Sequence, residues 1–321
     1  MAKTVRASTK SNDGVCDKVN DMLHNMSMKD DKDIVLSVCA NCGKDNATNI
    51  CNKCHSVKYC NAACKKKHRH KHKKDCERRV EELHDEKLFQ QPPPEEDCAI
   101  CFLRLPSLAS AQSYRACCGK ILCQGCTYAA KKSSSLCPFC RTPPPNSLRE
   151  AMERYKKRME LNDASAIYNL AGFYTDGRYG LPQSHAKALE LHHQAAELGH
   201  AEAYNNLGYA YNNGIGVERD EKKAWYYYEI SAMKGGVYAR HNLGDEENRK
   251  GNVDRALKHW IIATEGGYKT SLERIKRLYT NGHATKDDYA IALGKFQEYV
   301  GEIKSDQRDE AAAFDADWIY Y

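Results

Sequence analysis

The second half of the chain, from Ser147 onward, places its apolar residues with the period of amphipathic helices. A short pattern returns four times there, as Ala166-Ile-Tyr-Asn-Leu170, Ala203-Tyr-Asn-Asn-Leu207, Ala239-Arg-His-Asn-Leu243 and Ser271-Leu-Glu-Arg-Ile275. The last residues of these copies are 37, 36 and 32 positions apart. Each copy runs on to a glycine that can end a helix, and a second amphipathic segment follows it. Paired helices with this period predict an α-solenoid.

Cysteine dominates the first half, where the helical period is missing. Fifteen of the 16 cysteines lie between Cys39 and Cys140, while residues 1–38 show no period and are expected to be mostly disordered. No run of about 18 apolar residues exists, and the polar residues that follow Met1 lead us to expect no secretory signal. We therefore expect a cytoplasmic or nuclear protein without a membrane partner, in a compartment where clustered cysteines bind metal rather than form disulfides.

The first cysteine block follows the spacing of metal ligands over residues 39–76. Its candidate ligands are Cys39, Cys42, Cys51, Cys54, Cys60, Cys64, His72 and Cys76. Eight ligands are enough for two tetrahedral zinc ions, and no position is left open for a catalytic water. A segment this short cannot bury enough apolar surface to fold alone, so metal binding would supply its folding energy. On spacing alone, His68 and His70 are rival ligands to His72.

This block is similar to the MYND finger, whose spacing it matches throughout. The resemblance implies interleaved sites, with one ion held by Cys39, Cys42, Cys60 and Cys64 and the other by Cys51, Cys54, His72 and Cys76. MYND fingers bind protein partners, often through short proline-containing motifs. The family usually has tryptophan three residues before the ligand histidine, where this chain has Arg69, so the usual peptide groove is altered here.

Positive charge is concentrated in the same block. Residues 39–79 contain 12 Lys or Arg against 3 Asp or Glu, a net +9, whereas the whole chain is +6. Nucleic-acid contact or nuclear import is one interpretation. A solvated helix face on a small zinc module is the favoured one, because no aromatic residues are interleaved for base stacking.

The second cysteine block covers residues 98–141 and contains no histidine. Its candidate ligands are Cys98, Cys101, Cys117, Cys118, Cys123, Cys126, Cys137 and Cys140. Two further tetrahedral zinc ions would use all eight, leaving Cys16 as the one cysteine without a role. We therefore expect four structural zinc ions in the chain.

The second block resembles an all-cysteine RING finger. That resemblance implies one ion shared by Cys98, Cys101, Cys123 and Cys126, and another shared by Cys117, Cys118, Cys137 and Cys140. The adjacent pair departs from the family, which usually leaves a residue between these ligands. Either Gly119 supplies the bend that lets both reach one ion, or one of the pair is spare.

Three further residues match positions at which RING-type ligases engage a ubiquitin-conjugating enzyme. Ile100 and Pro138 match the apolar contact surface, and Arg141 matches the basic residue that reaches both the conjugating enzyme and ubiquitin. An exposed isoleucine on a very small zinc module has little core to serve, which favours a binding role. The alternative is that Ile100 packs inside and Arg141 is ordinary surface.

The helical half resembles the Sel-like repeats, a branch of the tetratricopeptide-like family, over about residues 160–300. The resemblance includes the inter-helix loop Gly214-Ile-Gly216-Val-Glu-Arg-Asp220. The third copy lacks that loop at residues 248–254, so a tight turn is expected there.

These patterns predict a mainly α protein, with two small zinc-stabilised fingers followed by an α-solenoid of paired helices. The expected segments are a lead-in (1–38), a MYND-type finger (39–76), a charged helix and proline-rich linker (77–97), a RING-type finger (98–141), a linker and entry helix (142–160), Sel-like repeats (161–301) and an acidic tail (302–321). The tail would cap the stack or hang free.

The leading functional hypothesis is a RING-type ubiquitin ligase. It would recruit a ubiquitin-conjugating enzyme, select protein substrates through the repeats and supply no catalytic nucleophile of its own. The alternative is a non-catalytic adaptor, including one in transcriptional control, and nucleic-acid binding is a third, less favoured interpretation. No phosphate loop, nucleotide fingerprint or open metal site points to a metabolic enzyme.

Overall fold

The computed structural model describes residues 38–93 and 96–321 of the chain. Within them the protein is mainly α, as predicted, and it divides between Glu82 and Leu83 into two compact units. The expected disordered lead-in and Cys16 lie outside the described residues. No helix of the described ranges combines the length and apolarity that a membrane crossing requires.

The first unit is a small hairpin followed by the start of a long helix. Strands β1 (Asn49–Ile50) and β2 (Lys58–Tyr59) pair antiparallel, and α2 (Ala62–Leu88) follows. The charged stretch predicted to be helical after residue 77 is thus the second half of a helix that begins 15 positions earlier. Besides Tyr59, the buried apolar groups in the described part of this unit are mostly cysteines, so that part has almost no conventional core.

The second unit begins with the end of α2 and the second cysteine block. This block contains η1 (Ala109–Ala111), the antiparallel strands β3 (Gln112–Arg115) and β4 (Lys120–Cys123), and helix α3 (Gln124–Ser133). We call residues 96–142 the second zinc module.

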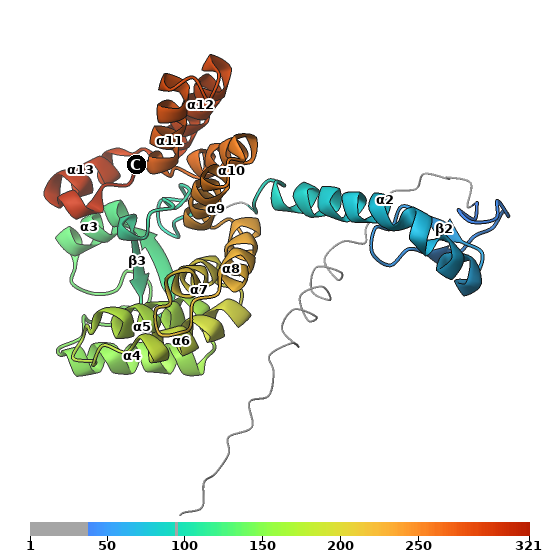
Figure 1. Ribbon diagram of the computed structural model, residues 1–321. Coiled ribbons are helices and arrows are strands. Elements are labelled where there is room, and N and C mark those ends of the chain that lie inside the picture. Colours follow the sequence, from blue (N-terminus) through green and yellow to red (C-terminus); the bar gives the residue numbers. More distant parts are fainter. Residues whose placement is uncertain (1–37, 94–95) are drawn as a thin grey trace, which may run out of the picture. The chain divides into compact units, whose positions relative to one another are not determined.

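Stacked helices make up the rest of this unit (Figure 1). They are α4 (Leu148–Glu160), α5 (Ala164–Asp176), α6 (His185–Glu197), α7 (Ala201–Asn213), α8 (Glu221–Met233), α9 (Val237–Arg249), α10 (Val253–Glu265), α11 (Lys269–Thr280) and α12 (Lys286–Ile303). Their contacts are most extensive within the pairs α5–α6, α7–α8 and α9–α10, which are the paired helices that the repeat period predicts.

Capping residues and small residues explain where these helices begin and how closely they pack. The side chains of Ser147, Asp163 and Ser184 each accept a hydrogen bond from the backbone at the third residue of the next helix. A Cβ on Gly244 would lie 2.5 Å from Trp260 Nε1, and one on Gly208 would lie 2.6 Å from the Tyr228 ring. Glycine therefore lets the two helices of a repeat approach each other closely.

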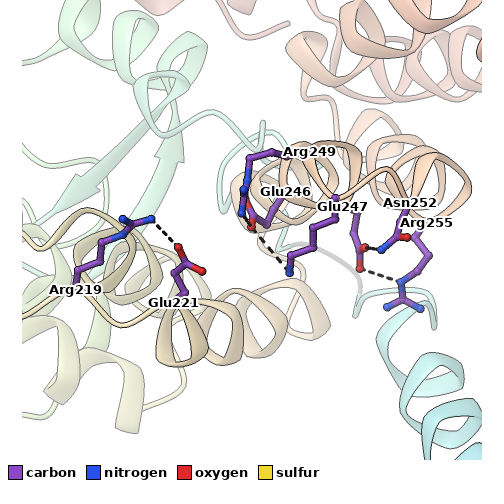
Figure 2. Close-up of polar contacts among 8 residues, drawn as sticks. Arg219, Glu221, Glu246, Glu247, Arg249, Asn252 and Arg255 are labelled. Carbon is purple, nitrogen blue, oxygen red and sulfur yellow. Dashed lines mark hydrogen bonds and ion pairs between the residues drawn. The ribbon is translucent and has the colours of Figure 1, made fainter.

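The turn of the third repeat is tight, because only Lys250, Gly251 and Asn252 separate α9 from α10. Glu247 is buried beside this turn and accepts hydrogen bonds from Asn252 Nδ2 at 2.7 Å and Arg255 Nε at 2.9 Å (Figure 2). These two bonds compensate the cost of burying the Glu247 carboxylate. They stabilise the short turn that replaces the loop used by the other repeats.

After α12 the chain turns back. Helix α13 (Asp306–Phe314) and η2 (Ala316–Trp318) follow, and α13 packs against α3 of the second zinc module (Figure 1). The acidic tail therefore does not hang free, and its Tyr320 is buried together with Tyr299 and Ile303 of α12, the last helix of the stack.

Candidate zinc centres

The structure brings the 16 candidate ligands together in four groups of four. Within each group, the potential ligand atoms all lie within 4.8 Å of one another. The groups are Cys39, Cys42, Cys60, Cys64 (group 1); Cys51, Cys54, His72, Cys76 (group 2); Cys98, Cys101, Cys123, Cys126 (group 3); and Cys117, Cys118, Cys137, Cys140 (group 4). The interleaving is the one that the two resemblances imply.

Group 1 lies between the hairpin and the first turn of α2. The Sγ of Cys60 is 3.6 Å from that of Cys42 and 3.5 Å from that of Cys64. Asn41 donates its side-chain amide to Cys64 Sγ at 3.4 Å. Cys42 is exposed and Cys39 is buried, so this group lies at the surface.

Group 2 is buried at all four positions. Helix α2 supplies His72 and Cys76 from one face, since residues four apart lie one turn above each other. His72 Nε2 is 3.2 Å from Cys54 Sγ, and Cys76 Sγ is 3.8 Å from Cys51 Sγ.

The rival histidines lie outside group 2. His68 Nδ1 is 3.2 Å from the hydroxyl of Tyr59, and the His68 ring stacks on His72. His70 is exposed. The geometry therefore favours His72 among the three candidates.

Groups 3 and 4 occupy the second zinc module. In group 3, Cys101 Sγ is 3.9 Å from Cys123 Sγ, and Cys98 Sγ accepts a hydrogen bond from the backbone N–H of Cys123 at 3.4 Å. In group 4, Cys118 Sγ is 3.8 Å from Cys137 Sγ.

Both members of the adjacent pair Cys117 and Cys118 belong to group 4. The backbone N–H groups of Cys118 and Gly119 both donate to the carbonyl of Arg115, and Gly119 has a φ of 76°. The left-handed glycine thus completes the bend that brings both sulfurs to one side.

These distances agree with the size of a zinc tetrahedron. Zn–S bonds of about 2.3 Å place the sulfurs about 3.8 Å apart, and the neighbouring Sγ pairs of the four groups lie 3.5–3.9 Å apart. Three groups offer four thiols each, and group 2 offers three thiols and one imidazole, which are the donor sets of structural zinc sites. The four groups fit structural zinc binding, and the assignment of each side chain as a ligand stays a prediction.

The thiols of group 2 differ in their pKa values. Burial raises the pKa of Cys51, but hydrogen bonds from the backbone of Cys54 and Lys53 outweigh burial and lower it to about 6. Burial and the neighbouring Cys51 thiol raise the pKa of Cys76 to about 12. A cation at the centre of the group would remove this conflict by stabilising every thiolate.

The predicted contact residues for a conjugating enzyme are accessible. Ile100 is 38% exposed, Pro138 is half-buried, and Arg141 is exposed in a left-handed turn with a φ of 58°. Phe102 and Phe139, which the sequence pattern did not single out, are also exposed. Phe102 directly follows Cys101, and Phe139 directly precedes Cys140. Like Ile100, these exposed side chains contribute little to a hydrophobic core.

Two family models match parts of the chain. The MYND finger matches residues 39–76, and the Sel1 repeat matches residues 164–200 and 201–236. The chain therefore contains a MYND finger and Sel1 repeats.

Two curated proteins are similar to part of this chain. "Chitin synthase regulatory factor 4" of Schizosaccharomyces pombe is 28% identical over 129 residues, which are 40% of this chain and 20% of that protein. An uncharacterized protein of Neisseria meningitidis is 30% identical over 163 residues, 48% of this chain and 32% of that protein. The chain thus spans less than a third of either relative.

Two solved structures are also similar. A Sel1 repeat protein from Oxalobacter formigenes is 23% identical with a TM-score of 0.42, covering 47% of this chain and 64% of that one. A protective antigen of uropathogenic Escherichia coli with an SLR fold is 21% identical with a TM-score of 0.42, covering 60% of this chain and 44% of that one.

Together, the zinc finger and the Sel1 repeats indicate a protein that interacts with other proteins.

Proposed function

We propose that this protein is a RING-type ubiquitin ligase that recruits a ubiquitin-conjugating enzyme through the second zinc module and selects protein substrates through its helical repeats. The observation that supports this most is the pairing of groups 3 and 4. Eight cysteines within residues 98–140 form two interleaved sets in the order that a RING finger requires. Exposed apolar residues flank those sets, where a conjugating enzyme would dock.

Such a ligase would act by positioning. Ile100 and Pro138 would hold the conjugating enzyme, while the planar guanidinium of Arg141 would donate hydrogen bonds to that enzyme and to the ubiquitin linked to it. Holding the thioester in one reactive geometry lowers the entropic part of the barrier without a nucleophile from this chain. Zinc would supply only the fold of the module.

The way in which the second zinc module is attached to the helical repeats supports a role in substrate positioning. On one side, Tyr114 Oη donates to Asp163 Oδ2 at 2.7 Å, and Arg158 Nη2 donates to the same oxygen at 2.6 Å. On another side, Arg104 Nη1 donates to Glu302 Oε2 at 2.8 Å. A substrate bound to the repeats would therefore be presented to the conjugating enzyme at a fixed distance rather than on a flexible tether.

The experiment is a ubiquitin-discharge assay with the full chain. Conjugating enzymes from a panel are charged with ubiquitin, and its release to free lysine is followed in a single turnover. We expect wild-type protein to accelerate discharge, Ile100→Ala to abolish or greatly reduce it through lost contact, and Arg141→Ala to lower the rate.

Matched controls are Leu161→Ala and Arg149→Ala, which remove an exposed apolar and an exposed basic side chain from the helical half. Both should discharge ubiquitin like wild type. If zinc-loaded wild-type protein accelerates no enzyme of the panel, the adaptor hypothesis replaces the ligase. If the two module variants also behave like wild type, the contact residues are wrong.

A further inference from the structure

The C-terminal helix α13 brings an arginine to the cysteines of group 3. Arg308 is 2% exposed, and its Nη1 donates to the carbonyl of Ile303 at 2.7 Å. Its Nη2 lies 3.4 Å from the carbonyl of Leu103 and 3.7 Å from Cys101 Sγ. The neighbouring Gln307 places its Oε1 3.7 Å from Cys126 Sγ.

This arginine has no carboxylate partner among the described residues; its contacts there include two carbonyls and the sulfurs of Cys101 and Cys123. A buried guanidinium without an opposing charge is costly, because desolvation is not repaid. Four thiolates around a divalent ion have a net charge of −2. That negative charge is the one opposing charge that group 3 would place beside Arg308.

Other contacts hold α13 in place against the module. The ring of Tyr128 on α3 lies 5.0 Å from that of Phe314, and Lys132 Nζ is 3.1 Å from Glu310 Oε2. A Cβ on Gly125 would lie 2.8 Å from the backbone nitrogen of Arg308, so α13 approaches α3 closely.

We propose that Arg308 is the charge partner of the four thiolates that would hold a zinc ion in group 3, and that the C-terminal segment 305–321 completes the second zinc module. Zinc binding at group 3 and docking of α13 then stabilise each other, because a coupling between two binding events acts equally in both directions. This proposal rests on zinc binding by group 3 and is independent of ligase activity.

The first test measures zinc release from the intact chain to a colorimetric chelator, with Arg308→Met, Arg308→Lys and Asp306→Asn beside wild type. Loss of a group that hydrogen-bonds a metal ligand typically lowers metal affinity about 10–100-fold. We expect Arg308→Met to weaken one of the four ions by about that factor and to leave the others unchanged. Arg308→Lys keeps the charge and should lie between, while Asp306→Asn, an exposed change at the start of the same helix, should match wild type.

Replacing zinc with cobalt gives an absorption spectrum that altered packing alone would not change. The sulfur-to-cobalt charge-transfer absorption of group 3 should shift in Arg308→Met, because a thiolate ligand loses a cationic hydrogen-bond donor. An unchanged spectrum and unchanged zinc affinity in folded Arg308→Met would overturn the proposal.

Hydrogen exchange on the wild-type chain tests the reverse direction without any variant. After zinc removal, the amides of Asp306–Phe314 should lose protection, whereas those of α7 and α8 should keep it. Persistent protection of α13 in the zinc-free chain would contradict the coupling. A failed ubiquitin discharge would leave these results unaffected, so the two proposals fail separately.

Discussion

A histidine buried in the helical half predicts a steep loss of stability in mild acid. His259 on α10 is fully buried, and neither ring nitrogen has a hydrogen-bond partner within residues 38–93 and 96–321. Its ring lies 4.7 Å from that of Phe89. Burial, together with the positive charges of Arg240 and Arg255, lowers the pKa of His259 to about 2.

The sign and size of the effect follow from proton linkage. The unfolded chain binds a proton at His259 near pH 6.5, whereas the folded chain does not do so until about pH 2. Below pH 6.5 the unfolded state therefore holds one more proton, and stability falls by about 1.4 kcal/mol per pH unit. Between pH 7 and pH 5 the loss is about 2 kcal/mol, a large part of the roughly 5–15 kcal/mol that stabilises a typical domain.

The assay is urea unfolding at pH 7 and pH 5, followed by far-UV circular dichroism, for wild type and His259→Leu. Acid also protonates zinc ligands, but that contribution is common to both proteins and cancels in the comparison. We expect the variant to lose about 2 kcal/mol less stability than wild type over this interval. His283→Leu removes an exposed histidine and serves as the control. Equal losses in wild type and His259→Leu would refute the reasoning.

Three other predictions concern packing, a buried charge and metal removal. Gly244→Ala should cost about 1–3 kcal/mol in urea unfolding because its Cβ would overlap Trp260, whereas Gly172→Ala, with nothing within 4 Å of the new Cβ, should be neutral or slightly stabilising. Arg240 is 1% exposed, and none of its guanidinium nitrogens has a partner among the described residues. Arg240→Met should therefore raise the unfolding free energy by about 1–4 kcal/mol, and a loss of stability would show that Arg240 has a partner in solution. A strong chelator should unfold α3 and α13 but leave α5–α10 folded, so far-UV circular dichroism should keep most of its helical signal. Loss of most helicity would contradict a solenoid that folds by the stacking of its helices.

Local patterns allowed much of this fold to be predicted. The solenoid repeats one apolar pattern, and each repeat packs mainly on its neighbours, so periodicity in sequence maps directly onto periodicity in space. Cysteine spacing likewise identified the candidate zinc ligands, because pairs three or four positions apart can reach one tetrahedral ion. Their division into four groups was implied by the MYND and RING resemblances.

Contacts between distant segments could not be predicted in this way. Arg308 and Cys101 are 207 positions apart, and nothing in the acidic tail indicates that it packs on α3. The length of α2 was also missed, because its first half has the composition of a solvated charged run, and the inward residues His72 and Cys76 follow ligand spacing rather than an apolar period.

The central claim is that zinc folds both cysteine-rich modules, with two ions in each. Native mass spectrometry of the full chain, compared with the same protein after denaturation and metal removal, tests it most directly. We expect a mass difference of four zinc ions and no disulfide in the denatured chain. Two or fewer ions, or cysteines of groups 1–4 joined as disulfides, would contradict it.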